Sequence, residues 1–232
     1  MKKIKVMVVF GTRPEAIKMA PLVLELQKQH DRIDTVTVVT AQHRQMLDQV
    51  LETFKIQPEY DLDIMGKNQS LLDITARILE KFDPVVKEEK PDMILVHGDT
   101  TTTFVASLVA FYNQVRIGHV EAGLRTFDKY SPYPEEMNRQ MTDNLADLYF
   151  APTSDSKANL LKENHPESAI FITGNTAIDA LQLTVQEDYH HEVLDQLDRL
   201  KKLVLVTMHR RENQGQPMRA VFGALREMVD AH

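Results

Sequence analysis

The chain has 232 residues, of which 43% are hydrophobic and 26% charged, and it contains no cysteine. These proportions are typical of a globular protein, and the lack of cysteine excludes disulfides, thiolate metal sites and a cysteine nucleophile. The formal net charge is -7, which argues against a nucleic-acid partner because proteins that bind phosphate backbones present an excess of Lys and Arg.

The N-terminal segment MKKIKVMVVFG lacks the length and the small-residue cleavage site of a signal peptide. The sequence also contains no run of about 18 apolar residues, the length that a membrane-spanning helix needs. We therefore expect a cytoplasmic protein with no membrane partner.

Short apolar segments alternate with segments of helical character along the chain. We predict strands at KVMVVF, TVTVVT, MILVH, RIGHVEA, DLYFA, AIFIT and KLVLVTM. We predict helices after the first strand and near 43–54, 70–89, 101–112, 134–146, 155–164 and 217–230. This alternation indicates βαβ units, and uninterrupted apolar strands indicate a sheet covered by helices on both faces. The predicted fold class is α/β, with a mainly parallel, doubly wound sheet.

The first predicted helix has a clear start. Thr12 is a plausible N-cap, and Glu15 three residues later completes a capping box, with Pro14 tolerated in the first turn. The turn before it carries one glycine, Gly11, and lacks the glycine-rich pattern of a dinucleotide-binding loop.

The last part of the chain repeats the pattern of the first. KLVLVTMHRREN begins with lysine and an apolar run and continues with basic residues where a helix should start, as KVMVVFGTRPE does. A polar, charged stretch at 184–201 precedes it. We interpret residues 1–185 as an N-terminal Rossmann-like domain and residues 186–232 as the beginning of a C-terminal Rossmann-like domain that is incomplete in this chain.

Four polar elements fall at the ends of predicted strands, where open α/β sheets bind their ligands. They are GTR at 11–13, GDT at 98–100, EAG at 121–123 and HRR at 209–211. Carboxylates, a histidine and cations would meet there. Such a set suits a phosphate-bearing ligand and acid/base chemistry.

Each candidate side chain also has a simpler structural interpretation. Arg13 and Lys18 either bind an anion at the helix N-terminus or lie on a solvated surface. Asp99 is either a general base or the N-cap of the following helix. Glu121 is either a partly desolvated carboxylate with a raised pKa or the partner of Arg125 or Arg116.

Two further candidates follow the same logic. Glu135 lies in the first turn of a predicted helix, where the helix dipole favours acids, and could form a simple surface pair with Arg139 four residues later. His209 lies at a strand end before two arginines, an arrangement suited to a leaving phosphate.

Six motifs in this order, FGTRPEAIKMAPL, VHGDTTTT, GHVEAGLRT, PYPEEMNRQ, ITGNT and HRREN, resemble the non-hydrolysing bacterial UDP-N-acetylglucosamine 2-epimerases. The resemblance covers nearly the whole chain. It implies the glycosyltransferase-B architecture, with two Rossmann-like domains and a nucleotide sugar in the cleft. It also implies interconversion of UDP-N-acetylglucosamine and UDP-N-acetylmannosamine at C2, through elimination of UDP, a 2-acetamidoglucal and re-addition of UDP.

The resemblance assigns roles to the candidate residues. Asp99, Glu121 and Glu135 match the catalytic carboxylates of the family, and His209 matches a histidine that assists the departure of UDP. Residues that contact or balance the nucleotide phosphates are Arg13, Lys18 and Arg139. The resemblance implies no metal and no other cofactor.

Similar bacterial enzymes also bind UDP-N-acetylglucosamine as an allosteric activator. The positions that this implies are Gln42, His43, Gln45, Gln69 and Arg210. Asn68 departs from the arginine expected next to Gln69, which puts one activator contact in doubt. A homodimer is the family expectation, and the product would feed a cell-surface polymer such as a teichoic acid or a capsule.

The resemblance also predicts limited binding and activity for this chain alone, because the second half of the C-terminal domain supplies uridine and pyrophosphate contacts in the family. We expect residues 1–232 in isolation to bind UDP weakly and to turn over poorly. The alternatives are a UDP-sugar glycosyltransferase of the same fold and a non-catalytic nucleotide-sugar sensor. A dinucleotide dehydrogenase is disfavoured by the missing glycine pattern.

Overall fold

The computed structural model describes residues 3–41, 44–66, 69–198, 200–208 and 215–231. The chain forms two compact units, Met1–Val185 and Gln186–His232.

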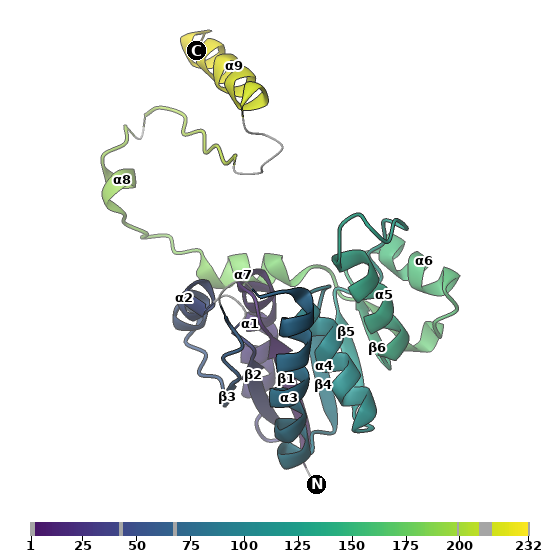
Figure 1. Cartoon of the computed structure of the whole chain (residues 1–232). Helices are drawn as coiled ribbons and strands as arrows, with labels where there is room; N and C mark the ends of the chain where they lie inside the picture. The colour runs from purple at the N-terminus through teal and green to yellow at the C-terminus, as the bar shows by residue number, and fades with distance from the viewer. Residues whose placement is uncertain (1–2, 42–43, 67–68, 199, 209–214, 232) are drawn as a thin grey trace. The chain divides into compact units, whose positions relative to one another are not determined.

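The first unit is built on a sheet of seven strands in the order β3-β2-β1-β4-β5-β6-β7 (Figure 1). Every neighbouring pair of strands is parallel. The strands are β1 Ile4–Phe10, β2 Ile33–Val39, β3 Tyr60–Asp61, β4 Met93–His97, β5 Arg116–Val120, β6 Leu148–Ala151 and β7 Ile170–Ile172. Strand order reverses between β1 and β4, and the carboxyl ends of these two strands are where doubly wound sheets bind ligands.

Seven α-helices alternate with these strands in the described part of this unit, and the sequence predicts the first six of them. They are α1 Arg13–Lys28, α2 Arg44–Phe54, α3 Leu71–Glu89, α4 Thr101–Tyr112, α5 Glu135–Leu145, α6 Ser154–Lys162 and α7 Thr176–Thr184. The parallel α/β fold class is therefore confirmed. Strand β3 is the one strand of this unit that was not predicted, because its two residues at the sheet edge carry no hydrophobic pattern.

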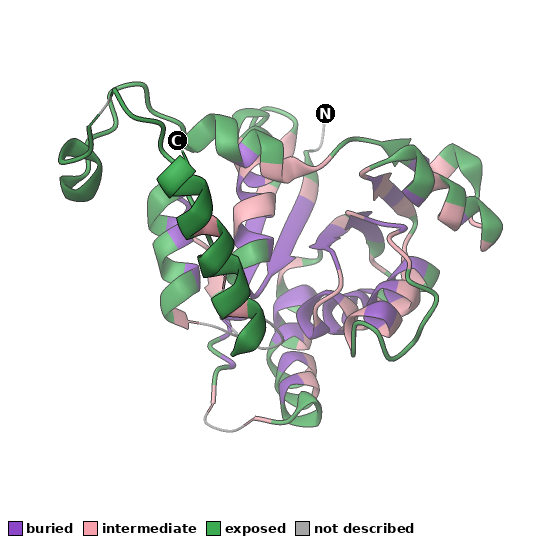
Figure 2. Ribbon diagram, turned by 90° about the horizontal axis from the view of Figure 1, so that it is seen from above, coloured by how far each residue is buried: buried purple, intermediate pink, exposed green. Residues whose placement is uncertain are grey.

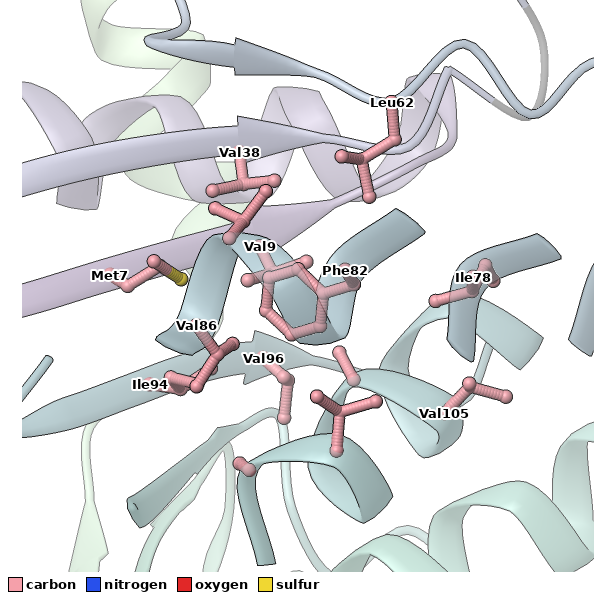
Figure 3. Packing of buried hydrophobic residues seen from close by; sticks show 14 of the residues in the cluster. Met7, Val9, Val38, Leu62, Ile78, Phe82, Val86, Ile94, Val96 and Val105 are labelled. Atoms are coloured by element: carbon pink, nitrogen blue, oxygen red, sulfur yellow. The ribbon is translucent and has the colours of Figure 1, made fainter. Parts of the chain in front are cut away.

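The buried residues, purple in Figure 2, belong to the strands and to the helices packed against them. Because successive residues of a strand point to opposite faces, Met7 and Val9 of β1 pack toward α3 and α4, around Phe82 (Figure 3). Val8 and Phe10 belong to the second core cluster, which includes residues of α1 and α2. Helices therefore cover both faces, and the strand ends are left to carry polar groups.

The second unit contains two helices among its described residues, α8 Glu192–Asp195 and α9 Gln216–Ala231. The helix predicted near 217–230 is confirmed. The strand predicted at 202–208 is wrong, because these residues have no regular secondary structure. A strand forms only by pairing with a neighbour, and no other strand occurs in the described part of this unit. The side chain of Leu205 is accordingly 91% exposed.

None of the helices that the structure describes has both the length and the apolar character that a bilayer crossing requires.

Candidate active site

The turn between β1 and α1 is closed by its own carboxylate. Glu15 is buried and accepts hydrogen bonds from the backbone N–H groups of Gly11, at 3.1 Å, and Thr12, at 2.7 Å. The hydroxyls of Thr100 and Thr103 also donate to it, at 2.7 and 3.1 Å. The predicted capping box is confirmed, and the backbone N–H groups of Gly11 and Thr12 are already bonded within the turn.

Gly11 is required by close packing. A Cβ atom at this position would lie 2.0 Å from Thr40 Oγ1 and 2.5 Å from Thr102 Oγ1, and both of these threonines are buried. One glycine is therefore enough for this turn, because it brings β1 against two neighbouring segments rather than making room for a pyrophosphate.

The two predicted cations of α1 lie in different surroundings. Arg13 is exposed and lines a hollow of about 310 Å³ with residues of α1, α2 and α7. Lys18 is half-buried, and its ammonium bonds both carboxylate oxygens of Glu121, at 2.8 and 2.6 Å. The structure thus brings Lys18, but not Arg13, into contact with a predicted catalytic residue.

Glu121 follows β5 and is held from three elements. Besides Lys18 of α1, the side-chain amide of Asn175, the N-cap of α7, donates to its carboxylate at 3.2 Å. The Nε2 atom of His97, the last residue of β4, lies 3.4 Å from the same oxygen without hydrogen-bond geometry. The pairing considered from the sequence, with Arg125 or Arg116, is wrong, since Arg125 bonds Asp143 and Glu163 instead.

These neighbours control the charge of Glu121. Burial would raise the pKa of its carboxyl, but the His97 ring and the Lys18 ammonium outweigh burial and lower the pKa to about 2. The expected raised pKa is therefore wrong, and Glu121 is ionised at neutral pH. Its backbone has a φ of 66°, in the left-handed region that costs a side-chain-bearing residue about 1–3 kcal/mol.

The surroundings of Asp99 shift the pKa of its carboxyl in the opposite direction. Burial, together with the charges of Glu135, Glu121 and Glu15, raises the pKa of its carboxyl, although the Arg139 guanidinium opposes this. Arg139 Nη2 lies 3.0 Å from Asp99 Oδ2.

Asp99 is not a helix cap. Thr100 takes the N-cap position of α4 and accepts from the N–H of Thr103, so that interpretation of Asp99 is wrong. The side chain of Asp99 keeps 29% of its surface exposed. It is therefore both partly desolvated and open to a ligand.

The start of α5 carries the third candidate catalytic carboxylate. Glu135 is the first residue of the helix and is partly exposed. The expected Glu135–Arg139 pair of side chains does not form, because the Arg139 side chain reaches Asp99 and touches only the Glu135 carbonyl, at 3.4 Å. The neighbouring Glu136 is fully buried and accepts from the backbone N–H groups of Thr126 and Phe127, which fixes the loop before α5.

Several predicted positions lie outside the described residues: Gln42, His43, Asn68, His209 and Arg210. Of the other predicted activator contacts, Gln45 is exposed and lines a hollow of about 540 Å³. Gln69 uses its side-chain amide locally, accepting from the Gly66 N–H at 2.7 Å and donating to the Ile64 carbonyl at 2.6 Å.

Sequence reasoning missed three members of the site: His97, Asn175 and the carboxylate of Glu15 as an acceptor for the Thr100 and Thr103 hydroxyls. His97 and Asn175 follow strands in VHGD and ITGNT, so their place at strand ends was a usable signal. Within the described ranges, no group of three or more His, Asp or Glu side chains could hold a metal ion.

The switch point of the sheet thus carries two carboxylates with pKa shifts in opposite directions, with Lys18 on one and Arg139 on the other. This arrangement defines the class of protein as a Rossmann-like α/β domain with a candidate acid/base site at the carboxyl edge of its sheet, where such domains bind ligands.

The particular family follows from comparison with known proteins. The chain belongs to the UDP-N-acetylglucosamine 2-epimerase family, whose model matches residues 25–232. A UDP-N-acetylglucosamine 2-epimerase of Bacillus subtilis is 62% identical over 229 residues, which are 99% of this chain and 60% of that protein. The resemblance inferred from the six motifs is therefore confirmed.

Solved structures agree with this assignment. A structure from Listeria monocytogenes is 56% identical and has a TM-score of 0.93, covering 100% of this chain and 60% of that one. The Neisseria meningitidis UDP-GlcNAc 2-epimerase, solved bound to UDP-GlcNAc, is 58% identical with a TM-score of 0.74, over 78% of this chain and 49% of that one. The chain spans about 60% of the length of the curated relatives it matches.

Proposed function

We propose that the protein interconverts UDP-N-acetylglucosamine and UDP-N-acetylmannosamine by inverting C2 of the sugar, without hydrolysis. The observation that supports this most is the pair of strand-end carboxylates, Glu121 with a pKa of about 2 and Asp99 with a raised pKa. Groups whose surroundings push their pKa values apart are suited to act as proton acceptor and proton donor in one reaction.

The chemistry needs such a pair because the C2 proton is not acidic enough for direct exchange. A base takes the proton from C2, the C–H electron pair forms the C1=C2 double bond, and the C1–O bond breaks so that UDP leaves with its electrons. An acid then protonates C2 of the 2-acetamidoglucal on the other face, and UDP adds back to C1. Asp99 and Glu121 take part in these proton transfers, and Glu135 completes the carboxylate group.

Lys18 connects the acid/base site to the leaving group. In this structure it neutralises Glu121, and a carboxylate with a pKa of about 2 is a weak base. A diphosphate that draws the ammonium away would raise the pKa of Glu121 and strengthen it as a base when the substrate is in place. Arg13, Arg139 and His209 serve the phosphates in the same proposal, with His209 assisting UDP departure.

Other parts of the proposal rest on the family resemblance. They are the UDP-N-acetylglucosamine activator at Gln42, His43, Gln45, Gln69 and Arg210, a homodimer, a cytoplasmic location, and a product that feeds cell-surface polysaccharides. Residues 186–232 would begin the second Rossmann-like domain, and residues 1–232 alone would be poorly active.

The decisive experiment incubates the full-length protein with UDP-N-acetylglucosamine in deuterated water. Epimerisation through elimination requires deuterium at C2 of both sugars, whereas a glycosyltransferase would leave C2 unlabelled. Glu121→Gln should abolish the exchange, whereas the control variant Glu167→Gln should not, because Glu167 is an exposed carboxylate that pairs with Lys157. Unlabelled sugar after prolonged incubation with the active-site residues intact would refute the proposal.

A further inference from the structure

A row of charged side chains lies buried beside the two candidate catalytic carboxylates. Arg125 donates to Glu163 through Nε, at 2.8 Å, and through Nη2, at 2.6 Å. Its Nη2 also bonds Asp143 Oδ2 at 2.6 Å, and Asp143 Oδ1 lies 2.5 Å from His119 Nδ1. The side chains of His119, Asp143 and Arg125 have no exposed surface. We call these four residues the buried charge chain.

The buried charge chain ends on the backbone that carries Asp99. The Nε2 atom of His119 lies 2.7 Å from the carbonyl oxygen of Gly98, the residue before Asp99. Gly98 has a φ of +68° and donates its N–H to the Val120 carbonyl at 2.9 Å, so its peptide is fixed from both sides.

The backbone that follows Glu121 is also held by the buried charge chain. Asp143 Oδ2 accepts from the backbone N–H of Gly123, two residues after Glu121, at 3.3 Å. One carboxylate on α5 therefore connects the segments that carry both Asp99 and Glu121.

The contacts of His119 set its protonation. A carbonyl oxygen and a carboxylate oxygen are both acceptors, so each ring nitrogen must donate, and a neutral ring would aim a lone pair at one of them. The proton between His119 and Asp143 belongs on the ring, because Arg125 bonds the other oxygen of Asp143 and favours its ionised form.

The charges of the four side chains agree with a protonated ring. With an imidazolium at His119 they sum to zero, whereas a neutral ring would leave the set with a net charge of -1. Glu163, at the end of the set, keeps 28% of its side chain exposed. Tyr149 faces Asp143 from β6, and burial together with the Asp143 charge raises the pKa of Tyr149 to about 12, so it adds no charge. His165 lies 3.7 Å from Glu163 at the far end.

We propose that His119 is a positioning residue that stays doubly protonated and, by holding the Gly98 carbonyl, fixes the place of the Asp99 carboxylate. Its part in catalysis rests on the function proposed above. Its protonation does not, since that follows from the buried contacts alone.

The direct test is nitrogen NMR of the full-length protein with labelled histidine rings. Both ring nitrogens of His119 should carry protons at neutral pH, because each faces an acceptor. The signal is assigned by its loss in His119→Gln. A ring nitrogen without a proton at neutral pH would overturn the inference.

Kinetics test the positioning role. His119→Ala removes the donor that holds the Gly98 carbonyl, and Asp143→Asn removes the counter-charge of the ring. Each should lower kcat by about 100-fold, the effect of a displacement near 1 Å, while KM for UDP-N-acetylglucosamine changes little. Asp147→Asn is the matched control, because Asp147 lies just after α5 and accepts from the Ile117 N–H of β5 rather than contacting His119.

The outcomes separate the two proposals. A neutral His119 ring in an active enzyme refutes this inference alone, and so does an unchanged kcat in both variants. A doubly protonated ring in a protein that never exchanges the C2 proton refutes the proposed function and the catalytic part of the inference, but not the protonation of His119. Circular dichroism of each variant separates a loss of kcat from a loss of fold, and the nitrogen signal of the unaltered protein decides if the variants do not fold.

Discussion

The ion pair between Lys18 and Glu121 offers a quantitative prediction. The carboxylate titrates near pH 2 in the folded protein against an ordinary value of 4.5. This difference corresponds to about 3 kcal/mol of stabilisation, shared between His97 and Lys18. Both partners of the pair are largely buried, with 24% of the Lys18 side chain and 13% of the Glu121 side chain exposed. We assign about 2 kcal/mol to Lys18, because its ammonium bonds both carboxylate oxygens at 2.8 and 2.6 Å, whereas the His97 ring lies 3.4 Å away without hydrogen-bond geometry.

The perturbation is Lys18→Met, which keeps most of the aliphatic stem and removes the charge. A depressed pKa contributes stability that is fully present above the unfolded value of 4.5 and lost as the pH falls toward about 2. The variant should therefore be about 2 kcal/mol less stable than the parent at neutral pH, and the two should converge at the acid end.

The assay is urea unfolding of the full-length protein across this pH range, followed by circular dichroism, with carbon NMR of the Glu121 carboxyl as a direct reading of its pKa. Lys28→Met is the control, since it removes an exposed pair with Glu25 and should change nothing measurable. In a Glu121→Gln background the pH dependence of the Lys18 effect should vanish. A loss of stability that is the same at every pH would refute the reasoning, because it would mean that packing of the lysine stem, not its charge, matters.

Three further predictions concern neighbouring groups. Glu15→Ala removes the acceptor for two backbone N–H groups and two hydroxyls and should lower the free energy of unfolding by about 3 kcal/mol; a loss under about 1 kcal/mol in urea unfolding would contradict the closed turn. Arg139→Met removes the cation that lowers the pKa of Asp99, so carbon NMR should show a higher pKa for the Asp99 carboxyl. The alkaline limb of the pH profile of C2 exchange should move to higher pH. A lower pKa of Asp99 in the variant would contradict the contact between Arg139 and Asp99. Arg13→Ala should weaken UDP binding by about tenfold in calorimetry. The free energy of unfolding should not change, because Arg13 is exposed. A UDP affinity equal to that of the parent protein would remove Arg13 from the proposed phosphate site.

The hydrophobic pattern was sufficient to predict six of the seven strands in the sheet of the first unit. MILVH at 93–97 and the helix at 101–112 agree with β4 and α4 residue for residue. Both segments are buried by local partners that the alternation of strands and helices already implies. The segment 202–208 has the same apolar pattern, yet it forms no strand, since pairing depends on a neighbour that the pattern does not encode.

The site was predictable by location but not by electrostatics. The expected partial burial of Glu121 is confirmed, and Asp99 beside it is partly buried as well. The direction of the Glu121 pKa depends on Lys18, more than a hundred positions away in the sequence, and on a histidine at the end of another strand. Local sequence also offered Arg125 or Arg116 as the partner of Glu121, whereas the Arg125 guanidinium pairs with Asp143.

The left-handed backbone at Glu121 has a consequence for substitution at this position. Glycine adopts a φ of 66° without steric penalty, but glycine at 121 would also lose the ion pair with Lys18. The strain of the turn is therefore offset within the fold by the contacts of the same side chain. Glu121→Gly alone should gain no thermal stability, whereas the same change in a Lys18→Met background, where the pair is already lost, should raise it.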